Sequence, residues 1–260
     1  MLNTIIEYAF TNVYGEEYAN IINEKLKNSE IFFYENNNIS YKTHNKLNDE
    51  NFINKNREMN MSGVVPNFGI DNKLFNTVLI KISDDFKGIY NVVTLHEMNH
   101  VIGSNYKTTK NGINYIDYGL SERNFTNDYK FTSAGVDYLD EVVNHYITLQ
   151  AAEFIKNNEI SFIDDNENFI LYNTSLYEEV FPIMKPFLEH YDHDLKEVYL
   201  FGGKEKFIDK IGKENFIELN SLLKHHFRSE KKDASIEEIT LDRLNKVYDN
   251  LEINTNKKRK

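Results

Sequence analysis

The feature that most constrains the fold is a strand-like segment followed by a helix with two histidines. The segment TVLIKIS (77–83) is β-branched and partly alternating, which predicts a strand. Short polar residues at 83–85 can cap a helix start, and apolar positions recur with helical spacing over roughly 86–102. The sequence LHEMNHVIG (95–103) therefore lies on a helix that directly follows a strand, and Gly103 is suited to end that helix.

The two histidines of this helix are spaced for metal binding. His96 and His100 are four residues apart, so they project from one face and can converge on one ion. Glu97 is turned by about 100° from His96, which places its carboxylate beside such an ion without ligating it. A catalytic zinc has three protein ligands and an open position for water; the ion lowers the pKa of that water, and Glu97 would take its proton as it attacks a carbonyl. The alternative is an ordinary helix with two partly buried, hydrogen-bonded histidines.

The composition excludes several other kinds of site. The 260-residue chain has no cysteine, which excludes disulfides and thiolate ligands, so any metal must be held by histidine and carboxylate. The net charge of −11 disfavours nucleic-acid partners and adsorption to anionic membranes. The sequence contains neither a phosphate-binding glycine loop nor the GxSxG motif of serine hydrolases.

The localisation expected from the sequence is cytoplasmic. No apolar run reaches the ~20 residues needed to span a bilayer. The N-terminal segment MLNTIIEYAF has no basic residue before its apolar run, and no small-residue cleavage site follows it, so a secretory signal is not expected. Secretion by a signal-independent route stays open.

Upstream of the histidines, the patterns predict a helix and a small sheet. Residues 2–28 have helical periodicity that Gly15 can interrupt. The segment IFFYE (31–35) reads as a buried strand, with 39–43 able to pair back as a hairpin and 63–70 forming irregular structure or a sheet edge.

Downstream of the histidines, helices are expected to dominate. Residues 104–130 are polar without a strong period, whereas 136–155 form an amphipathic helix. Residues 175–251 read as mostly helical, with interruptions at Pro182, Pro186 and Gly202-Gly203. We therefore expect an α+β chain divided into a subdomain over 1–107, a mostly helical subdomain over 108–254, and a disordered basic tail at 255–260.

On the residues HEMNH, the chain resembles the zincin metallopeptidases. The resemblance implies that His96 and His100 ligate zinc and that Glu97 is the general base. It also implies a zincin-like fold, in which a small N-terminal mixed sheet supports the active-site helix and a mostly helical C-terminal part closes the other side of the cleft. The strand TVLIKIS would then border the cleft and could pair with an extended peptide substrate.

The third ligand separates two zincin branches. In the HExxHxxGxxH branch a third histidine follows, but here Gly103 matches and Tyr106 takes the histidine position. The glutamate branch takes its ligand from a second helix, and LDEVVNH (139–145) resembles the LNEGxTE-type segment of largely uncharacterised bacterial zincin-like proteins. That resemblance implies that Glu141 is the metal-binding carboxylate.

This second segment departs from the pattern in two places. Val142 replaces the usual glycine, and His145 replaces a carboxylate that would hydrogen-bond a ligating imidazole. Glu141 and His145 share a helix face, so His145 could support a ligand or compete as one. Asp137, one turn earlier, is the alternative carboxylate for the supporting role.

The function predicted from these residues is a zinc-dependent peptidase that acts on an unidentified peptide or protein. A zincin-fold protein without turnover and a host-targeted effector protease are the alternatives, and the unusual His145 motivates the first of them. The sequence does not single out an oxyanion donor among His145 and the nearby tyrosines at 115, 118, 138 and 146. The histidines at 190, 193, 225 and 226 are interpreted as surface or core residues.

Overall fold

The computed structural model describes two compact units built from helices and two four-stranded sheets, so the predicted α+β class is confirmed. The first unit contains residues 1–102 and 148–172, and the second contains 103–147 and 173–260. The chain therefore passes between the units at 103 and again at 148 and 173, whereas the sequence suggested a single boundary near 107. The structure describes residues 2–27, 29–35, 63–64, 67–70, 73–82, 92–108, 114–125, 131–135, 138–158, 180–228 and 234–253. The expected hairpin at 39–43 and the expected tail disorder at 255–260 lie outside these residues.

The N-terminal helix predicted over 2–28 is divided at Gly15, as its glycine suggested. It forms α1 (Leu2–Tyr14), the single 3-10 turn η1 (Glu16–Tyr18) and α2 (Ala19–Lys27). The apolar side chains of α1 at positions 6, 9, 10 and 14 are buried. Their i, i+3, i+4, i+8 spacing is that of a helix with one face in a core. In α2, Ile22 and Leu26 are buried in the same way.

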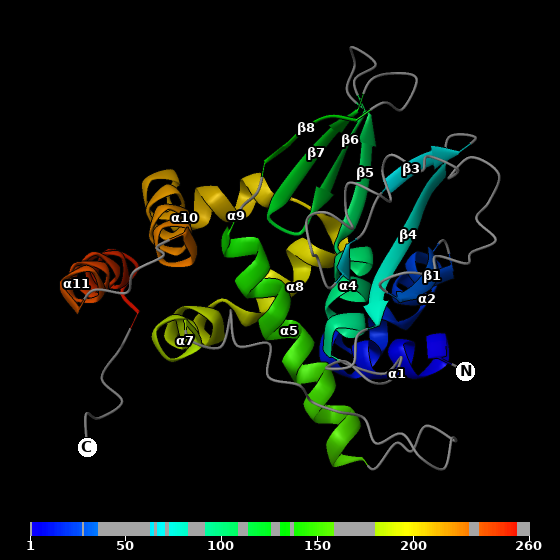
Figure 1. Cartoon of the computed structure of the whole chain (residues 1–260). Helices are drawn as coiled ribbons and strands as arrows, with labels where there is room; N and C mark the ends of the chain where they lie inside the picture. The colour runs from blue at the N-terminus through cyan, green and yellow to red at the C-terminus, as the bar shows by residue number, and fades with distance from the viewer. Residues whose placement is uncertain are drawn as a thin grey trace. The chain divides into compact units, whose positions relative to one another are not determined.

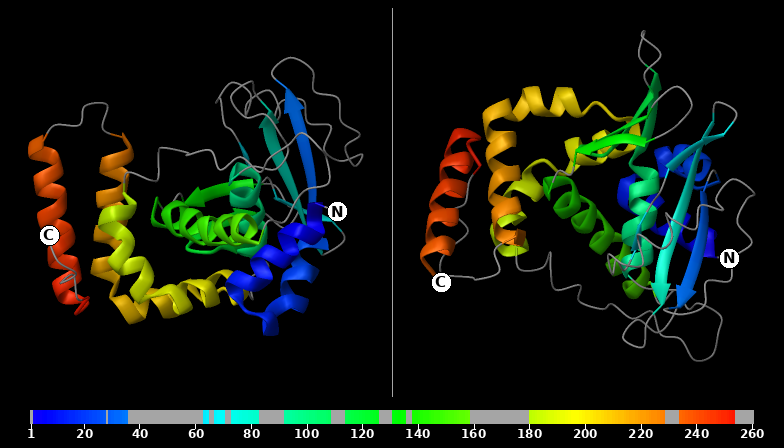
Figure 2. Two further views of the ribbon diagram at one scale, coloured as in Figure 1. Left: turned by 90° about the horizontal axis from the view of Figure 1, so that it is seen from below. Right: turned by 45° about the horizontal axis from the view of Figure 1, so that its top comes forward.

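The sheet of the first unit is mixed and is centred on β4 (Lys73–Ile82). The strand β1 (Ser29–Glu35) pairs with β4 in parallel, with Ser29 opposite Asn76 and Glu35 opposite Ile82. The two strands lie side by side in Figure 1 and in both views of Figure 2. On the other side of β4, β2 (Gly63–Val64) and β3 (Asn67–Ile70) pair with it in antiparallel orientation.

This topology corrects the expected role of TVLIKIS as a strand open to a substrate. β4 has neighbours on both sides, so most of its backbone N–H and C=O groups are already used in the sheet. A peptide that adds to a sheet needs a strand with an unpaired edge. The sequence misled because a β-branched run specifies a strand but not the number of its neighbours.

The helix with the two histidines is α4 (Val92–Ile102), which contacts α1, α2, β2 and β4 in the first unit (Figure 1). The expected start near 86 and the expected cap at 83–85 lie outside the described residues. Every residue of α4 except His100 is buried. A helix buried on all sides belongs to a core. The polar side chains within it therefore need specific partners.

A second sheet, which the sequence did not predict, occupies part of residues 104–135. Its strands β5 (Ser104–Thr108), β6 (Asn114–Tyr118), β7 (Ser121–Phe125) and β8 (Phe131–Gly135) form an antiparallel meander in chain order. The sheet is visible at the top of Figure 1, where β5 lies nearest α8 of the same unit. Strands such as SERNF have no clean alternation of apolar and polar residues, so the period-2 signal was absent.

The helix predicted over 136–155 is α5 (Tyr138–Asn157). Its residues 138–147 belong to the second unit and its residues 148–157 to the first. In the first unit, Phe154 of α5 meets the ring of Tyr8 edge-on, with centroids 5.2 Å apart. Aromatic pairs at this distance and orientation stabilise packing beyond their buried area.

Five further helices of the second unit lie among the described residues. They are α7 (Phe181–His190), α8 (Asp192–Phe201), α9 (Lys204–Ile211), α10 (Lys213–Arg228) and α11 (Ala234–Asn250). The predicted break at Gly202-Gly203 is confirmed, because φ values of 70° and 99° there end α8 and allow α9 to begin. The predicted break at Pro186 is wrong, because α7 continues through it. Pro182 lies in the first turn of α7, where its missing N–H has no helical partner to lose, and Pro186 is accommodated inside the helix.

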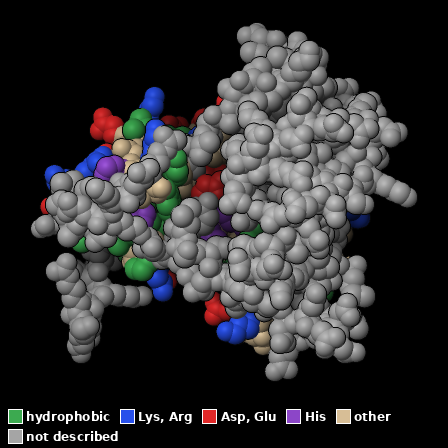
Figure 3. Space-filling view, viewed as in Figure 1, with side chains coloured by type: hydrophobic (Ala, Val, Ile, Leu, Met, Phe, Trp, Pro, Cys, Tyr) green, Lys and Arg blue, Asp and Glu red, His purple; other side chains and the backbone are tan. Residues whose placement is uncertain are grey.

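α10 and α11 are joined by a bidentate ion pair and lie side by side in Figure 2. Arg243 donates to both carboxylate oxygens of Glu218 at 2.6 and 2.9 Å. These hydrogen bonds lower the pKa of Glu218 and raise that of Arg243. The space-filling view shows charged side chains of both signs intermixed on the part of these C-terminal helices that is not covered by grey atoms (Figure 3).

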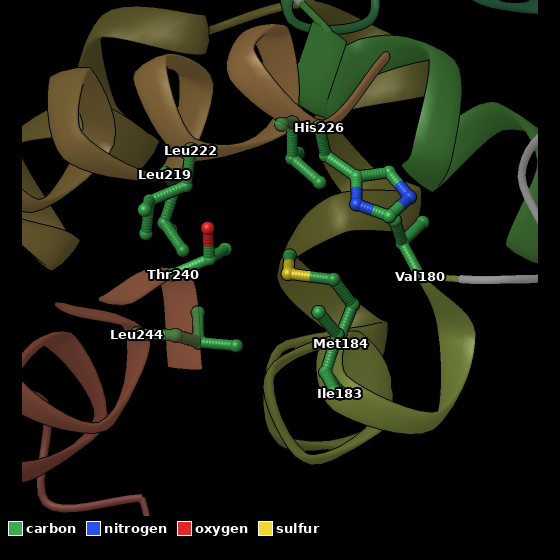
Figure 4. Close-up of a pocket in the computed structure, with 9 residues that line it drawn as sticks. Val180, Ile183, Met184, Leu219, Leu222, His226, Thr240 and Leu244 are labelled. Atoms are coloured by element: carbon green, nitrogen blue, oxygen red, sulfur yellow. The ribbon is translucent and has the colours of Figure 1, made fainter. Parts of the chain in front are cut away.

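A small cavity lies among α7, α10 and α11 (Figure 4). Its volume of about 10 Å³ is near the minimum for one water molecule. The lining is mainly aliphatic, with Met184, Leu222 and Leu244 among its members and Thr240 and His226 as the polar ones. A space of this size is a packing gap and is too small for a substrate.

Among the described residues, no helix combines the length and the apolar character that crossing a membrane requires.

Candidate functional site

The two histidines of α4 lie next to each other, as their spacing predicts. Their ring centroids are 4.9 Å apart. His96 is 8% exposed and His100 is half-buried. Glu97 is also buried, at 8% exposure. Ionisable side chains inside an otherwise apolar helix are costly to bury and are typical of functional sites.

A tyrosine of α1 forms a hydrogen bond with Asn99, which lies between the two histidines in the sequence. The Tyr14 hydroxyl donates to Asn99 Oδ1 at 2.7 Å, and both side chains are buried. Asn99 precedes His100 directly, so this hydrogen bond restrains the rotation of α4 about its axis. A buried amide with a partner also avoids the desolvation cost of an unmade hydrogen bond.

A lysine of α2 is bound to the end of α4. Lys25 Nζ donates to the carbonyl oxygen of Ile102, the last residue of the helix, at 2.6 Å. The last carbonyls of a helix have no partner within it, and the helix dipole favours a donor there. Burial lowers the pKa of Lys25 to about 7, because it disfavours the charged ammonium.

This lowered pKa predicts a stability change with pH. Between about pH 7 and the ordinary lysine pKa near 10.5, the unfolded chain holds a proton at Lys25 that the folded chain has released. The free energy of unfolding therefore rises with pH across this window. We expect the difference in free energy of unfolding between wild type and Lys25→Met to shift in favour of wild type by about 1–2 kcal/mol from pH 7 to pH 9.

Urea unfolding at the two pH values measures this difference. Lys27→Met is the matched control, because Lys27 is an exposed lysine on the same helix. A Lys25→Met difference that is equal at both pH values would show that the folded state does not release the proton.

The third candidate ligand, Glu141, lies in the first turn of α5. One ligand atom from each of His96, His100 and Glu141 lies within 4.8 Å of the others. Among the described residues, this is the group of three or more histidine and acidic side chains that could hold a metal ion. Glu97 and His145 are not members of the group.

His145 occupies a buried aromatic setting. It is 2% exposed, and its ring is stacked on Phe181, the first residue of α7, with centroids 5.4 Å apart and an interplanar angle of 11°. The stacking restrains the ring plane. The other residue suggested for a supporting role, Asp137, lies outside the described residues.

Asp140, next to Glu141, is a structural residue that the sequence did not identify. It is 1% exposed, and its Oδ1 accepts from the Leu120 backbone N–H at 2.8 Å and from the Tyr199 hydroxyl at 2.7 Å. The N–H of Leu139 donates to Asn220 Oδ1 at 3.0 Å. The first turn of α5 is therefore attached to the β6–β7 turn, to α8 and to α10.

The chain that leaves α4 is attached to the same tyrosine. A methyl group added to Gly103 would lie 2.8 Å from Tyr199 Cδ1, so the ring packs directly on that backbone. Asn105 Nδ2 donates to the carbonyl oxygens of Gly103, at 3.0 Å, and Tyr199, at 2.9 Å. Gly103 is needed for this close approach, in addition to the helix end that the sequence explained.

Gly119, in the turn between β6 and β7, also allows a close approach to Tyr199. Its φ is +51°, and a side chain there would come within 2.4 Å of the Tyr199 ring and 2.5 Å of Asp140 Oδ1. Its N–H donates to the Gly103 carbonyl oxygen at 3.0 Å. No signal in the sequence could have found these contacts, because they join residues up to 96 positions apart.

Two of the candidate tyrosines and three of the other histidines have defined surroundings. Tyr118 is buried, and Tyr138 stacks on Phe227 at 5.8 Å. His190, His193 and His225 are exposed, as expected for surface histidines. The oxyanion donor thus stays unassigned.

Comparisons with protein-family models, curated proteins and solved structures find no match to this chain.

Proposed function

We propose that this protein is a zinc-dependent peptidase with a zincin-like site. One observation carries the proposal: ligand atoms of His96, His100 and Glu141 gather within 4.8 Å. Two imidazoles and one carboxylate are a ligand set that catalytic zinc uses in peptidases, with one position left for water. Two atoms bound to one tetrahedral zinc at about 2.1 Å are about 3.4 Å apart, so the three side chains would draw closer together on binding it.

The proposed roles of the side chains follow from their positions. His96, His100 and Glu141 would hold the ion, and their restrained helices would keep the ligands in place. The zinc would supply a water of near-neutral pKa and polarise the scissile carbonyl. Glu97 would accept the proton of the attacking water and pass it to the leaving amine.

The gathering of the three ligands also bears on the alternative of an ordinary helix with two buried histidines. That alternative gives no reason for an acidic side chain from a separate helix to approach both rings. It also assigns no function to the paired histidines. A second alternative is a zincin-like protein without turnover, which would bind the metal but cleave no peptide. A cleavage assay therefore distinguishes it from the proposed peptidase.

Metal removal tests the proposal. The protein is purified without chelator and incubated with a peptide library, and the products are identified by mass spectrometry. We expect cleavage that is lost after dialysis against EDTA and restored by one equivalent of zinc, because the three ligands hold one ion. The temperature midpoint of unfolding should also rise when zinc is returned, since an ion that binds only the folded state stabilises it.

Two results would contradict the proposal at different levels. A zinc-loaded protein that cleaves no peptide would favour the non-catalytic alternative. A protein that takes up no zinc, with an unfolding midpoint unaffected by EDTA, would remove the metal site itself.

A further inference from the structure

One buried tyrosine contacts the chain segments that adjoin both parts of the proposed site. The Tyr199 ring packs on Gly103, which directly follows α4 and is three residues after His100. The Tyr199 hydroxyl donates to Oδ1 of Asp140 at 2.7 Å and lies 3.0 Å from the Asp140 backbone carbonyl oxygen. Asp140 directly precedes Glu141 in α5.

The tyrosine itself has little freedom to move. It is 0% exposed and lies within α8, and β5 contacts that helix. Gly103 and Gly119 approach its ring so closely that even a methyl group on either would overlap it. Its own carbonyl oxygen accepts from Asn105, two residues beyond Gly103. The ring and hydroxyl are thus fixed relative to both segments.

We propose that Tyr199 is a positioning residue that holds the first turn of α5, and with it Glu141, in place for metal binding. This inference rests on the proposed metal site. Ligand atoms must lie within a few tenths of an ångström of their ideal distance from the ion. Groups that orient ligands contribute about 10–100-fold to metal affinity. Without the hydroxyl, the first turn of α5 loses its bond to α8, and Glu141 is less well placed toward the histidines.

The test compares two tyrosine-to-phenylalanine variants of the full chain. Tyr199→Phe keeps the ring on Gly103 and removes only the donor to Asp140. Tyr248→Phe is the control: Tyr248 is 3% exposed in the same unit, and its hydroxyl donates at 2.5 Å to the carbonyl oxygen of Ile183, which belongs to neither ligand segment. Zinc dissociation constants are measured by competition with a chromogenic chelator, and unfolding midpoints by circular dichroism.

We expect both variants to lower the unfolding midpoint by a similar amount, about 2–4 °C for a lost buried hydrogen bond in a chain of this size. Tyr199→Phe alone should weaken zinc binding, by about 10-fold or more. The visible absorption of the cobalt(II) form should change in Tyr199→Phe and not in Tyr248→Phe, because it reports ligand geometry rather than stability.

A double-mutant cycle tests the route through Asp140. If Tyr199 acts through this carboxylate, zinc binding in Tyr199→Phe/Asp140→Ala should be no weaker than in Asp140→Ala. Losses that multiply independently would overturn that route. Equal zinc affinity and equal cobalt spectra in Tyr199→Phe and Tyr248→Phe would overturn the positioning role while leaving the proposed peptidase intact. A wild type that binds no zinc would overturn the proposed function, and this inference with it.

Discussion

Replacing His96 by alanine is expected to abolish zinc binding at physiological concentrations of the metal. His96 is one of the three proposed ligands, and its loss leaves two. A catalytic zinc needs three protein ligands, and even groups that only orient a ligand contribute about 10–100-fold in affinity, so the loss of a ligand should exceed ~100-fold. Metal content measured by inductively coupled plasma mass spectrometry should fall from one equivalent to a trace.

His193→Ala is the control for this experiment. His193 is a histidine whose side chain is 79% exposed, beside Glu197 on α8. Its removal should leave the zinc content unchanged. If His96→Ala retained one equivalent of zinc, the ion would be held by other side chains, and the proposed ligand set would be wrong.

Replacing Glu97 by glutamine is expected to lower kcat/KM for peptide cleavage by about 10²–10⁴-fold, the usual contribution of a general base. Glutamine has nearly the same size but cannot take the proton of the attacking water. Glu97 is not in the ligand group, so zinc content should stay at one equivalent. The separation of lost cleavage from retained metal distinguishes this role from that of His96.

The comparison for Glu97→Gln is Glu197→Gln, which changes a glutamate with a half-exposed side chain on α8. It should cleave as the wild type does. Cleavage by Glu97→Gln at the wild-type rate would assign the base to another residue. Loss of zinc together with cleavage would instead place Glu97 among the residues that hold the metal.

The two candidate histidine ligands could be named before the structure because they depend on local spacing. His96 and His100 are four positions apart, and in a helix residues at this spacing lie next to each other whatever the tertiary fold. Glu141 was reached differently, by a resemblance in the segment LDEVVNH, and its approach to the histidines is a tertiary fact. The amphipathic pattern that predicted α5 gave the face of Glu141 but not its partner.

The failures of prediction have equally specific reasons. β4 was expected to be open to a substrate, but strand pairing depends on distant segments, here β1 on one side and β2 and β3 on the other. The β5–β8 sheet was missed because its polar strands lack alternation. Pro186 was read as a break, although α7 continues through it. Pro182 lies in the first turn of that helix, which tolerates proline without losing a hydrogen bond.

The sequence by itself determined the α+β class, the helix of the two histidines, the break at Gly202-Gly203 and the exclusion of thiolate chemistry. These depend on periodicity, on backbone freedom and on which residue types are present. Only the tertiary structure decided that β4 is central, that Glu141 meets the histidines and that Tyr199 ties Gly103 to Asp140. Those contacts join residues far apart in the chain, so they cannot be predicted from local spacing.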